Sequence, residues 1–371
     1  MKKVLFILGT RPEVIKFAPL IEKLSGDRRF NCIVCFTGQH REMLYKTASF
    51  FGIKADHDLS LMVPNQSLAQ FVSSALVQLD LVIKKVLPDL VFVQGDTSTV
   101  LAGSLAAYYN QVRVAHLEAG LRSHDKYSPF PEEINRSLCS RIADYHFAPT
   151  ENARQNLIAE GIRDHIYVVG NTVIDALHLC LAKIKLQGEE HYYNAFSQVD
   201  FNRRIVLLTC HRRESFGAPL LEILHAMKTF ALQFKDIQII YPVHLNPNIK
   251  EVVYTQLSDI SNILLLPPMD YPELVWMMNK AYFVVTDSGG LQEEAPALKK
   301  PVLVLRENTE RIESIQANKS VLVGHDYEKI LSCMTRLCRD ESYYHSFEKE
   351  SNPYGDGNSS AKILEILAQS I

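Results

Sequence analysis

The stretch from Gln94 to Arg136 decides the fold, opening with QGDTSTV and closing with VAHLEAGLRSHDKYSPFPEEINR. Asp96 closely follows one short apolar run, and Glu118 follows another. Apolar runs that are this short and sharply bounded indicate buried strands. Both acids are therefore expected at the carboxyl ends of strands, the edge at which open α/β sheets bind their ligands.

A third acid, Glu132, follows the loop Ser128-Pro-Phe-Pro131, whose two prolines fix φ and hold the acid in place. Each acid alone has an ordinary interpretation. An Asp after a strand commonly shapes a turn, and a Glu after a proline commonly lies in the first turn of a helix, where the dipole favours it. Three acids delivered to one sheet edge indicate acid–base chemistry instead.

The composition limits the class of protein. The chain has 371 residues, 47% of them hydrophobic, which is enough for more than one core, so we expect two domains. A formal net charge of −3 argues against nucleic acid or an anionic membrane as the main partner. The apolar run after Met1 is interrupted at Arg11, and no longer stretch is apolar enough to span a membrane. We therefore expect a cytoplasmic protein.

The seven cysteines are scattered, which suits a reducing compartment. Cys32 and Cys35 form a C-x-x-C pattern, but CIVCF has the character of a strand, which would send the two thiols to opposite faces. We expect both to be small core residues and not zinc ligands.

Short apolar runs alternate with helical patterns, which predicts parallel sheets covered by helices on both faces. The expected strands are 4–8, 32–36, 90–93, 112–117, 145–148 and 166–169, then 205–208, 237–243, 263–266, 283–286, 302–305 and 321–323. The predicted fold class is α/β, with two Rossmann-like, doubly wound parallel-sheet domains facing across a cleft. We expect them at residues 1–170 and 171–357, with a last helix within 358–371 packing back on the first domain.

Two turns have the features of phosphate-binding elements. In Gly9-Thr-Arg-Pro12, after the first strand, free amides at a helix start would face an anion; Arg11 adds a fixed cation, with Lys16 nearby. The turn Ser288-Gly289-Gly290 has the same place in the second half, and its small residues let a diphosphate approach the backbone. Neither a kinase-type P-loop nor G-x-G-x-x-G occurs, which disfavours those two kinds of site.

Two histidines, His211 and His244, each follow a predicted strand of the second half. A loop histidine is often inert. One at a strand end that faces carboxylates is suited to proton transfer.

Taken together, these segments resemble the non-hydrolysing UDP-N-acetylglucosamine 2-epimerases. The matching segments cover nearly the whole chain in order: GTRPEVIKFAPL, GQHREML, GDTSTVLAGSLAAYY, HLEAGLRSHDKYSPFPEEINR, GNTVIDAL, HRRESFG, YPVHLNPN, DSGGLQEEAP, KPVLVLRENTER and NPYGDG. The resemblance implies two Rossmann-like domains similar to those of GT-B glycosyltransferases, a homodimer, and an active site in the interdomain cleft.

The resemblance also implies roles for individual residues. Catalysis would rest on Asp96, Glu118 and Glu132, with Arg11 and His211 beside them and also in contact with the substrate. The nucleotide and diphosphate would bind Lys16, Ser288, Gly289, Gly290, Glu294 and Arg311, with Glu294 on the ribose hydroxyls. Some bacterial members bind a second UDP-N-acetylglucosamine as an activator, and the matching positions here are Gln39, Arg212 and His244.

The implied reaction is reversible epimerisation at C2 of UDP-N-acetylglucosamine to UDP-N-acetylmannosamine. UDP would be eliminated to give a 2-acetamidoglucal and then re-added, with no metal or cofactor. The product would feed the synthesis of surface polysaccharide.

Three segments depart from the family pattern. Gln94 stands where HGDT is usual, ERIES at 310–314 lacks the proline of ERPEA, and PMDYPEL has Met269 and Leu274 in place of a glutamine and an aromatic residue. The last change bears on how uracil is recognised. Three alternatives therefore stay open: a GT-B glycosyltransferase that uses a UDP-sugar, an epimerase of another UDP-2-acetamido sugar, and a non-catalytic sugar-nucleotide sensor.

Overall fold

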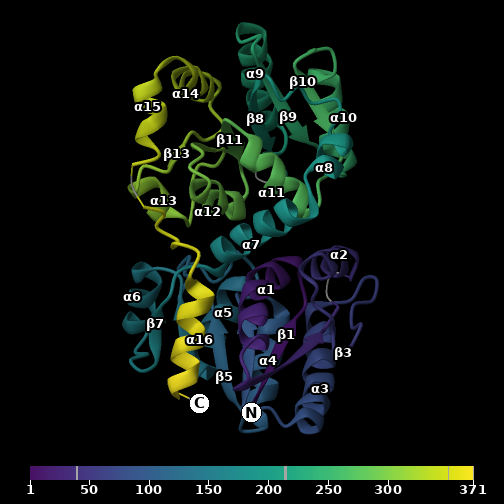
Figure 1. The fold of residues 1–371 in the computed structure, drawn as a ribbon, viewed down its shortest axis with the longest axis vertical. Coiled ribbons are helices and arrows are strands. Elements are labelled where there is room, and N and C mark those ends of the chain that lie inside the picture. Colours follow the sequence, from purple (N-terminus) through teal and green to yellow (C-terminus); the bar gives the residue numbers. More distant parts are fainter. Residues whose placement is uncertain (39–40, 213–214, 350, 371) are drawn as a thin grey trace. The chain divides into compact units, whose positions relative to one another are not determined.

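The protein is described by a computed structural model that covers residues 1–38, 41–212, 215–349 and 351–370. The chain forms two compact units (Figure 1). The first comprises Met1–Leu179 together with Tyr354–Ile371, and the second comprises Cys180–Pro353.

The first unit is built on a parallel sheet of seven strands in the order β3-β2-β1-β4-β5-β6-β7. Its strands are β1 (Lys2–Leu8), β2 (Phe30–Phe36), β3 (His57–Asp58), β4 (Leu90–Gln94), β5 (Arg113–Leu117), β6 (Tyr145–Ala148) and β7 (Ile166–Val168). The central strands β1 and β4 have nearly continuous apolar sequences because helices cover both of their faces.

The helices of the first unit divide between the two faces of this sheet. They are α1 (Arg11–Ser25), α2 (Arg41–Phe51), α3 (Leu68–Val86), α4 (Ser98–Tyr109), α5 (Glu132–Ile142), α6 (Glu151–Ala159) and α16 (Ser359–Ser370). One core joins β1 and β4 to α1, α2 and α16, and the other joins them to α3, α4 and α5. Cys32 belongs to the first core and Cys35 to the second, so the two thiols lie on opposite faces, as predicted.

The second unit repeats the architecture with six parallel strands in the order β10-β9-β8-β11-β12-β13. The strands are β8 (Arg204–Thr209), β9 (Ile237–Pro242), β10 (Ile263–Leu266), β11 (Phe283–Thr286), β12 (Val302–Val304) and β13 (Ser320–Leu322). Its helices are α8 (Glu190–Ala195), α9 (Ala218–Gln233), α10 (Pro247–Leu257), α11 (Tyr271–Lys280), α12 (Gly289–Ala297), α13 (Ile312–Gln316), α14 (Tyr327–Arg339) and α15 (Glu341–Ser346).

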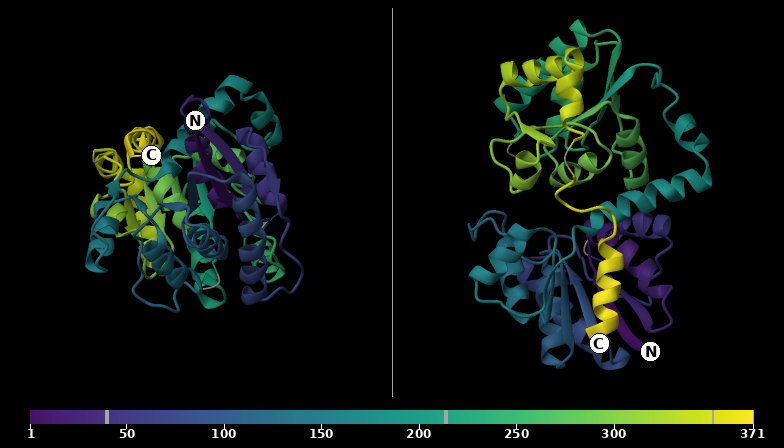
Figure 2. Two further views of the ribbon diagram at one scale, coloured as in Figure 1. Left: turned by 90° about the horizontal axis from the view of Figure 1, so that it is seen from below. Right: turned by 60° about the vertical axis from the view of Figure 1, so that its left-hand side comes forward.

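The chain passes from the first unit into the second within a single helix, α7 (Thr172–Gln187), after Leu179. It returns at Tyr354, and α16 then packs lengthwise on the first unit, with Ile363 and Leu367 in the same core as Phe17 of α1 (Figure 2). The predicted change of domain was near residue 170, where a glycine precedes α7. The helix continues across the break because its buried residues extend on both sides of it.

All twelve expected strands are present, and no end differs by more than two residues from its predicted position. The two-residue strand β3 was not predicted, because a segment this short leaves no alternating pattern. Within the residues that the structure describes, no helix is both long and apolar enough to cross a membrane.

Candidate active site

In a doubly wound sheet the ligand crevice forms where the strand order reverses, which in the first unit lies between β1 and β4. Arg11 is the first residue of α1, directly after the loop that follows β1, and the loop after β4 carries Asp96. Glu118 follows β5, which is paired with β4. The topology thus brings residues that are far apart in sequence to one sheet edge.

Glu118 is held in a strained and densely bonded position. Its backbone φ is +66°, in the left-handed region that non-glycine residues rarely adopt, and its side chain is only 8% exposed. The carboxylate forms an ion pair with Lys16 and accepts hydrogen bonds from the side-chain amides of Gln94 and, at 3.3 Å, Asn171. The backbone strain and these three partners fix the position of the carboxylate, which makes Glu118 a candidate functional residue.

Asp96 is the second acid of this cluster. The guanidinium of Arg136 donates to its carboxylate, and the side-chain amide of Asn135 donates to its backbone carbonyl at 2.9 Å. Burial raises the pKa of Asp96; the negative charge of Glu118 raises it too, while Arg136 and Lys16 oppose the rise. The raised pKa makes Asp96 easier to protonate than an aspartate on the protein surface, which suits it to proton exchange.

Glu132 is the first residue of α5, half-buried, and lies one helical turn before Arg136. Its neighbour Glu133 has a structural part, since its carboxylate accepts from the backbone amides of Ser123 (3.0 Å) and His124 (3.1 Å). The two adjacent glutamates therefore differ: one fixes the preceding loop, and the other belongs to the helix turn that reaches Asp96.

The loop after β1 departs from the prediction of free amides. The backbone amides of Gly9 and Thr10 donate to the carboxylate of Glu13, which lies in the first turn of α1. The helix start is thus capped internally, which offsets the cation at position 11. An anion here would meet the half-buried side chain of Arg11 and not these two amides.

In the second unit the strand order reverses between β8 and β11, and His211 and Asp287 follow these two strands. The fully buried Asp287 accepts from the backbone amides of His211 (2.7 Å) and Arg212 (2.8 Å), and His211 Nδ1 lies 3.1 Å from its Oδ1. Burial pushes the pKa of Asp287 upward, but the hydrogen bonds and charge of His211 and the backbone amides hold it below its ordinary value. Asp287 therefore fixes the loop that presents His211.

The start of α12 gathers the predicted nucleotide-binding residues. A Cβ built on Gly289 would lie 3.3 Å from the guanidinium carbon of Arg311, and one on Gly290 would lie 3.6 Å from Glu294 Oε2. The phenol of Tyr271 donates to the buried Glu294 at 2.8 Å. Ser288, the two glycines, Glu294 and Arg311 thus form one group, although they come from separate segments.

Arg311 itself is shared between acids. Its Nε donates to the buried Glu293 at 2.9 Å, and its NH1 donates to Glu310. Although burial acts to raise it, the charges of Arg311 and Arg306 lower the pKa of Glu310 to about 2. The arginine is therefore fixed in place without the proline of the usual ERPEA segment.

Of the expected activator residues, Gln39 lies outside the described residues. His244 is exposed, and its ring lies parallel to that of His211 with 6.2 Å between ring centroids. Arg212 is half-buried and next to His211. In the second unit, therefore, the candidate activator residues adjoin a candidate catalytic residue.

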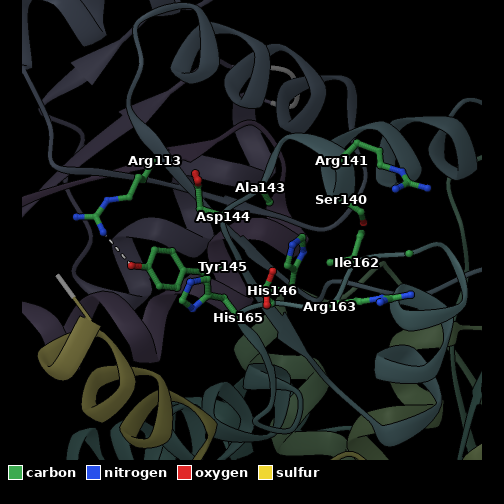
Figure 3. A pocket seen from close by; sticks show the side chains of 12 residues that line it. Arg113, Ser140, Arg141, Ala143, Asp144, Tyr145, His146, Ile162, Arg163 and His165 are labelled. Atoms are coloured by element: carbon green, nitrogen blue, oxygen red, sulfur yellow. Dashed lines mark hydrogen bonds between the residues drawn. The ribbon is translucent and has the colours of Figure 1, made fainter.

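A hollow of about 410 Å³ (Figure 3) lies at the amino-terminal ends of β5, β6 and β7. The acid cluster lies at the other edge of this sheet, since Asp96 and Glu118 follow the carboxyl ends of β4 and β5. The side chains of Arg113 and Arg141 extend away from each other, so their charges do not converge on the hollow (Figure 3). This hollow is not part of the candidate site.

Several residues of the site carried no predicted role. Arg136, Asn171, Glu13 and Asp287 all bond to predicted site residues or to the loops that carry them. All four lie inside the quoted segments EEINR, GNTVIDAL, GTRPE and DSGG, and that position was the available signal. Lys16, expected on the diphosphate, is paired with Glu118 in this structure.

Two Rossmann-like sheets, one with clustered carboxylates at its switch point and one with a glycine-opened helix there, define a GT-B-like α/β enzyme equipped for acid–base chemistry. The sequence profile described as UDP-N-acetylglucosamine 2-epimerase matches residues 22–368, and the chain belongs to this family.

Individual relatives agree over the whole length. The UDP-N-acetylglucosamine 2-epimerase of Escherichia coli strain K12 is 48% identical over 370 residues, which cover 98% of both chains. The crystal structure of UDP-GlcNAc 2-epimerase from Neisseria meningitidis bound to UDP-GlcNAc has a TM-score of 0.92 and 43% identity, covering 99% of this chain and 100% of that one. The enzyme from Methanocaldococcus jannaschii, in complex with UDP-GlcNAc and UDP, has a TM-score of 0.81 and 34% identity, with 99% and 100% covered.

Proposed function

We propose that this protein interconverts UDP-N-acetylglucosamine and UDP-N-acetylmannosamine by inverting C2 of the sugar. The observation that carries the proposal is a pair of carboxylates at one sheet edge, Asp96 and Glu118, which act on each other electrostatically. Glu118 is paired with Lys16, and Asp96 is paired with Arg136. Full-length relatives named for this activity support the same reaction.

The chemistry explains why two or more acids are needed. The hydrogen on C2 is not next to a carbonyl, so direct removal and return of that proton would face a large barrier. In the proposed route a carboxylate takes the C2 proton while the C1–O bond breaks and UDP leaves, giving a 2-acetamidoglucal. A second acid then protonates C2 from the other face, and UDP attacks C1 again.

We assign the acid and base roles to Asp96, Glu118 and Glu132. A base must be ionised and an acid protonated at the same pH, so their pKa values must differ. Burial and the negative charge of Glu118 raise the pKa of Asp96 against the opposing charges of Arg136 and Lys16. A carboxyl group whose pKa is raised is suited to the protonated role.

The second unit is proposed to bind UDP. The small residues of Ser288, Gly289 and Gly290 let a diphosphate approach the start of α12, and Arg311 supplies a fixed cation. Glu294 would accept from the ribose hydroxyls. As the C1–O bond breaks, the diphosphate gains charge, which these groups, with Arg11 and His211, would stabilise.

A glycosyltransferase would use the same kind of nucleotide site, but it needs one base and an acceptor pocket. Incubation with UDP-N-acetylglucosamine in D₂O, followed by NMR, separates the candidates. Deuterium at C2 with a second epimer supports the epimerase. Transfer of the sugar to an acceptor without exchange at C2 would support a transferase, and an unchanged sugar would support a sensor.

The sugar specificity needs its own test, since relatives acting on other UDP-2-acetamido sugars share much of the framework. Met269 is buried, and Leu274 lies in the first turn of α11, in the segment expected to face uracil. We propose N-acetylglucosamine as the sugar. Turnover with a different UDP-2-acetamido sugar at a higher kcat/KM would reject this choice.

We also propose a homodimer formed through helices α3 and α5. Val77 and Leu81 lie one turn apart on α3, Ile134 and Leu138 lie one turn apart on α5, and all four are exposed apolar residues. Sedimentation should give a dimer, and Val77→Asp with Leu81→Asp should give a monomer. A wild-type monomer would contradict the proposal.

A second UDP-N-acetylglucosamine as activator is proposed for the neighbourhood of Arg212 and His244. His244→Ala should make the rate depend hyperbolically on substrate where the wild type is sigmoidal. A hyperbolic wild type would remove this proposal and leave the reaction unaffected.

A further inference from the structure

Glu13 is a buried carboxyl group that the proposed reaction does not use. Its side chain lies in the first turn of α1, and the residue is 1% exposed. Oε1 accepts from the hydroxyl of Thr97 at 2.6 Å, and Oε2 accepts from the backbone amide of Thr10 at 2.9 Å and from that of Gly9.

These bonds join two separate loops of the site. Gly9 and Thr10 form the loop after β1 and directly precede Arg11, the first residue of α1. Thr97 directly follows Asp96 in the loop after β4. Thr97 also caps α4, since its hydroxyl accepts from the backbone amide of Val100 at 3.3 Å. Strands β1 and β4 are paired in the sheet, so one carboxyl group bridges the two loops at the switch point.

We propose that Glu13 is a positioning residue that sets the spacing between Arg11 and Asp96. This inference rests on the proposed function, in which Arg11 stabilises the departing diphosphate and Asp96 exchanges a proton at C2. Both events occur on adjacent carbon atoms in one elimination step. A displacement of about 1 Å in such an arrangement can cost about a hundredfold in rate.

The proximity of the two acids supports this role. Burial raises the pKa of Glu13 to about 7 despite its three hydrogen bonds, and the charge of Asp96 adds to the rise. The two carboxyl groups therefore influence each other, although only Asp96 is partly open to solvent.

Three variants test the proposal. Glu13→Gln keeps the size of the side chain, but an NH₂ group replaces one carboxylate oxygen and cannot accept the hydrogen bond that the hydroxyl of Thr97 donates to Oε1. Thr97→Val removes the hydroxyl on the other side of the bridge, and Thr97→Ser restores it. Glu22→Gln is the control, because Glu22 is an exposed residue of the same helix.

In Glu13→Gln and in Thr97→Val we expect kcat to fall about ten- to a hundredfold, with deuterium exchange at C2 falling in parallel. The affinity for UDP should change less than about threefold, since the residues proposed to hold UDP before the bond breaks, at the start of α12 and at Arg311, lie in the second unit, and Arg11 acts on the charge that develops afterwards. Thr97→Ser should recover most of the rate. Because both variants break the same bridge, the double variant should be no slower than the slower single one.

A kcat for Glu13→Gln equal to that of Glu22→Gln would overturn the proposal, as would strictly multiplicative losses in the double variant. Thermal unfolding of each variant shows whether the loss is one of folded protein only, and that outcome would also overturn it. If wild-type protein neither exchanges nor epimerises the sugar, the proposed function fails first, independently of Glu13.

Discussion

The guanidinium of Arg136 donates to the carboxylate of Asp96, which joins helix α5 to the end of strand β4. The same arginine lies 3.3 Å from Glu133, the acid that fixes the preceding loop. Arg136, which Glu133 holds in place, therefore favours the ionised form of Asp96.

Removing that cation should move the pH dependence of catalysis. Since Arg136 lowers the pKa of Asp96 against the effect of burial, Arg136→Gln should raise that pKa further. The limb of the kcat/KM profile that reports Asp96 should shift to higher pH, whereas Arg154→Gln, at an exposed ion pair on α6, should leave it in place. A profile of Arg136→Gln that coincides with that of Arg154→Gln would contradict the assignment.

Glu118→Gln should lower turnover by about 10²–10⁴, the range expected when a general acid or base is lost. The amide keeps the shape of the side chain, so UDP should still bind with similar affinity. Exchange at C2 in D₂O should fall with turnover. The matched control is Glu151→Gln on the surface of α6, and near-normal turnover in Glu118→Gln would reject its catalytic role.

Gly290→Ala should weaken UDP binding without unfolding the protein. The added Cβ would lie 3.6 Å from Glu294 Oε2 and 3.9 Å from Ser288 Oγ, which are ordinary contacts, so the fold should tolerate it. The methyl group would occupy the surface that a diphosphate must approach. We expect a loss on the order of tenfold, about 1.4 kcal/mol, by calorimetry. Gly26→Ala, at the end of α1 with φ −77°, is the control for the added methyl group.

Glu13 should make stability depend on pH. Its pKa rises from 4.5 to about 7 in the folded protein, so between these values the folded state holds a proton that the unfolded chain has lost. The contribution of Glu13 to the free energy of unfolding therefore falls as the pH rises through this window. At about 1.4 kcal/mol for each pH unit the total is roughly 3 kcal/mol.

The measurement is the unfolding temperature of the wild type and Glu13→Gln at pH 4.5 to 7.5. The difference between the two proteins should change across this range and level off at both ends. A constant difference would mean that Glu13 has its ordinary pKa.

The sequence was sufficient to predict every described strand except β3, and the sheet edge at which the candidate site lies. Asp96 and Glu118 follow buried apolar runs, and the order of parallel strands delivers them to one place. The grouping of Glu294 with the two glycines of α12 follows from helix geometry in the same way.

Partners of the acids were harder to predict. Arg136 bonds to Asp96, and Asn171 bonds to Glu118, from segments 35 or more residues away along the chain. Sequence spacing alone does not indicate which side chain will bond to each acid. Glu13 was similarly hidden, since an acid in the first turn of a helix is ordinary by itself. Its importance appears only when β1 and β4 are paired and Thr97 comes within reach.

The return of the chain at Tyr354 has a consequence for biosynthesis. The side chains of Ile363 and Leu367 complete the core around Phe17, and the carboxylate of Asp175 accepts from the backbone amides of Ser359 (3.2 Å) and Ser360 (2.7 Å). When the first 180 residues have emerged from the ribosome, the first unit therefore still lacks α16, one of the helices that cover its sheet. The first unit therefore completes its core only after the second unit has been synthesised, and its apolar surface stays exposed in the nascent chain until α16 emerges.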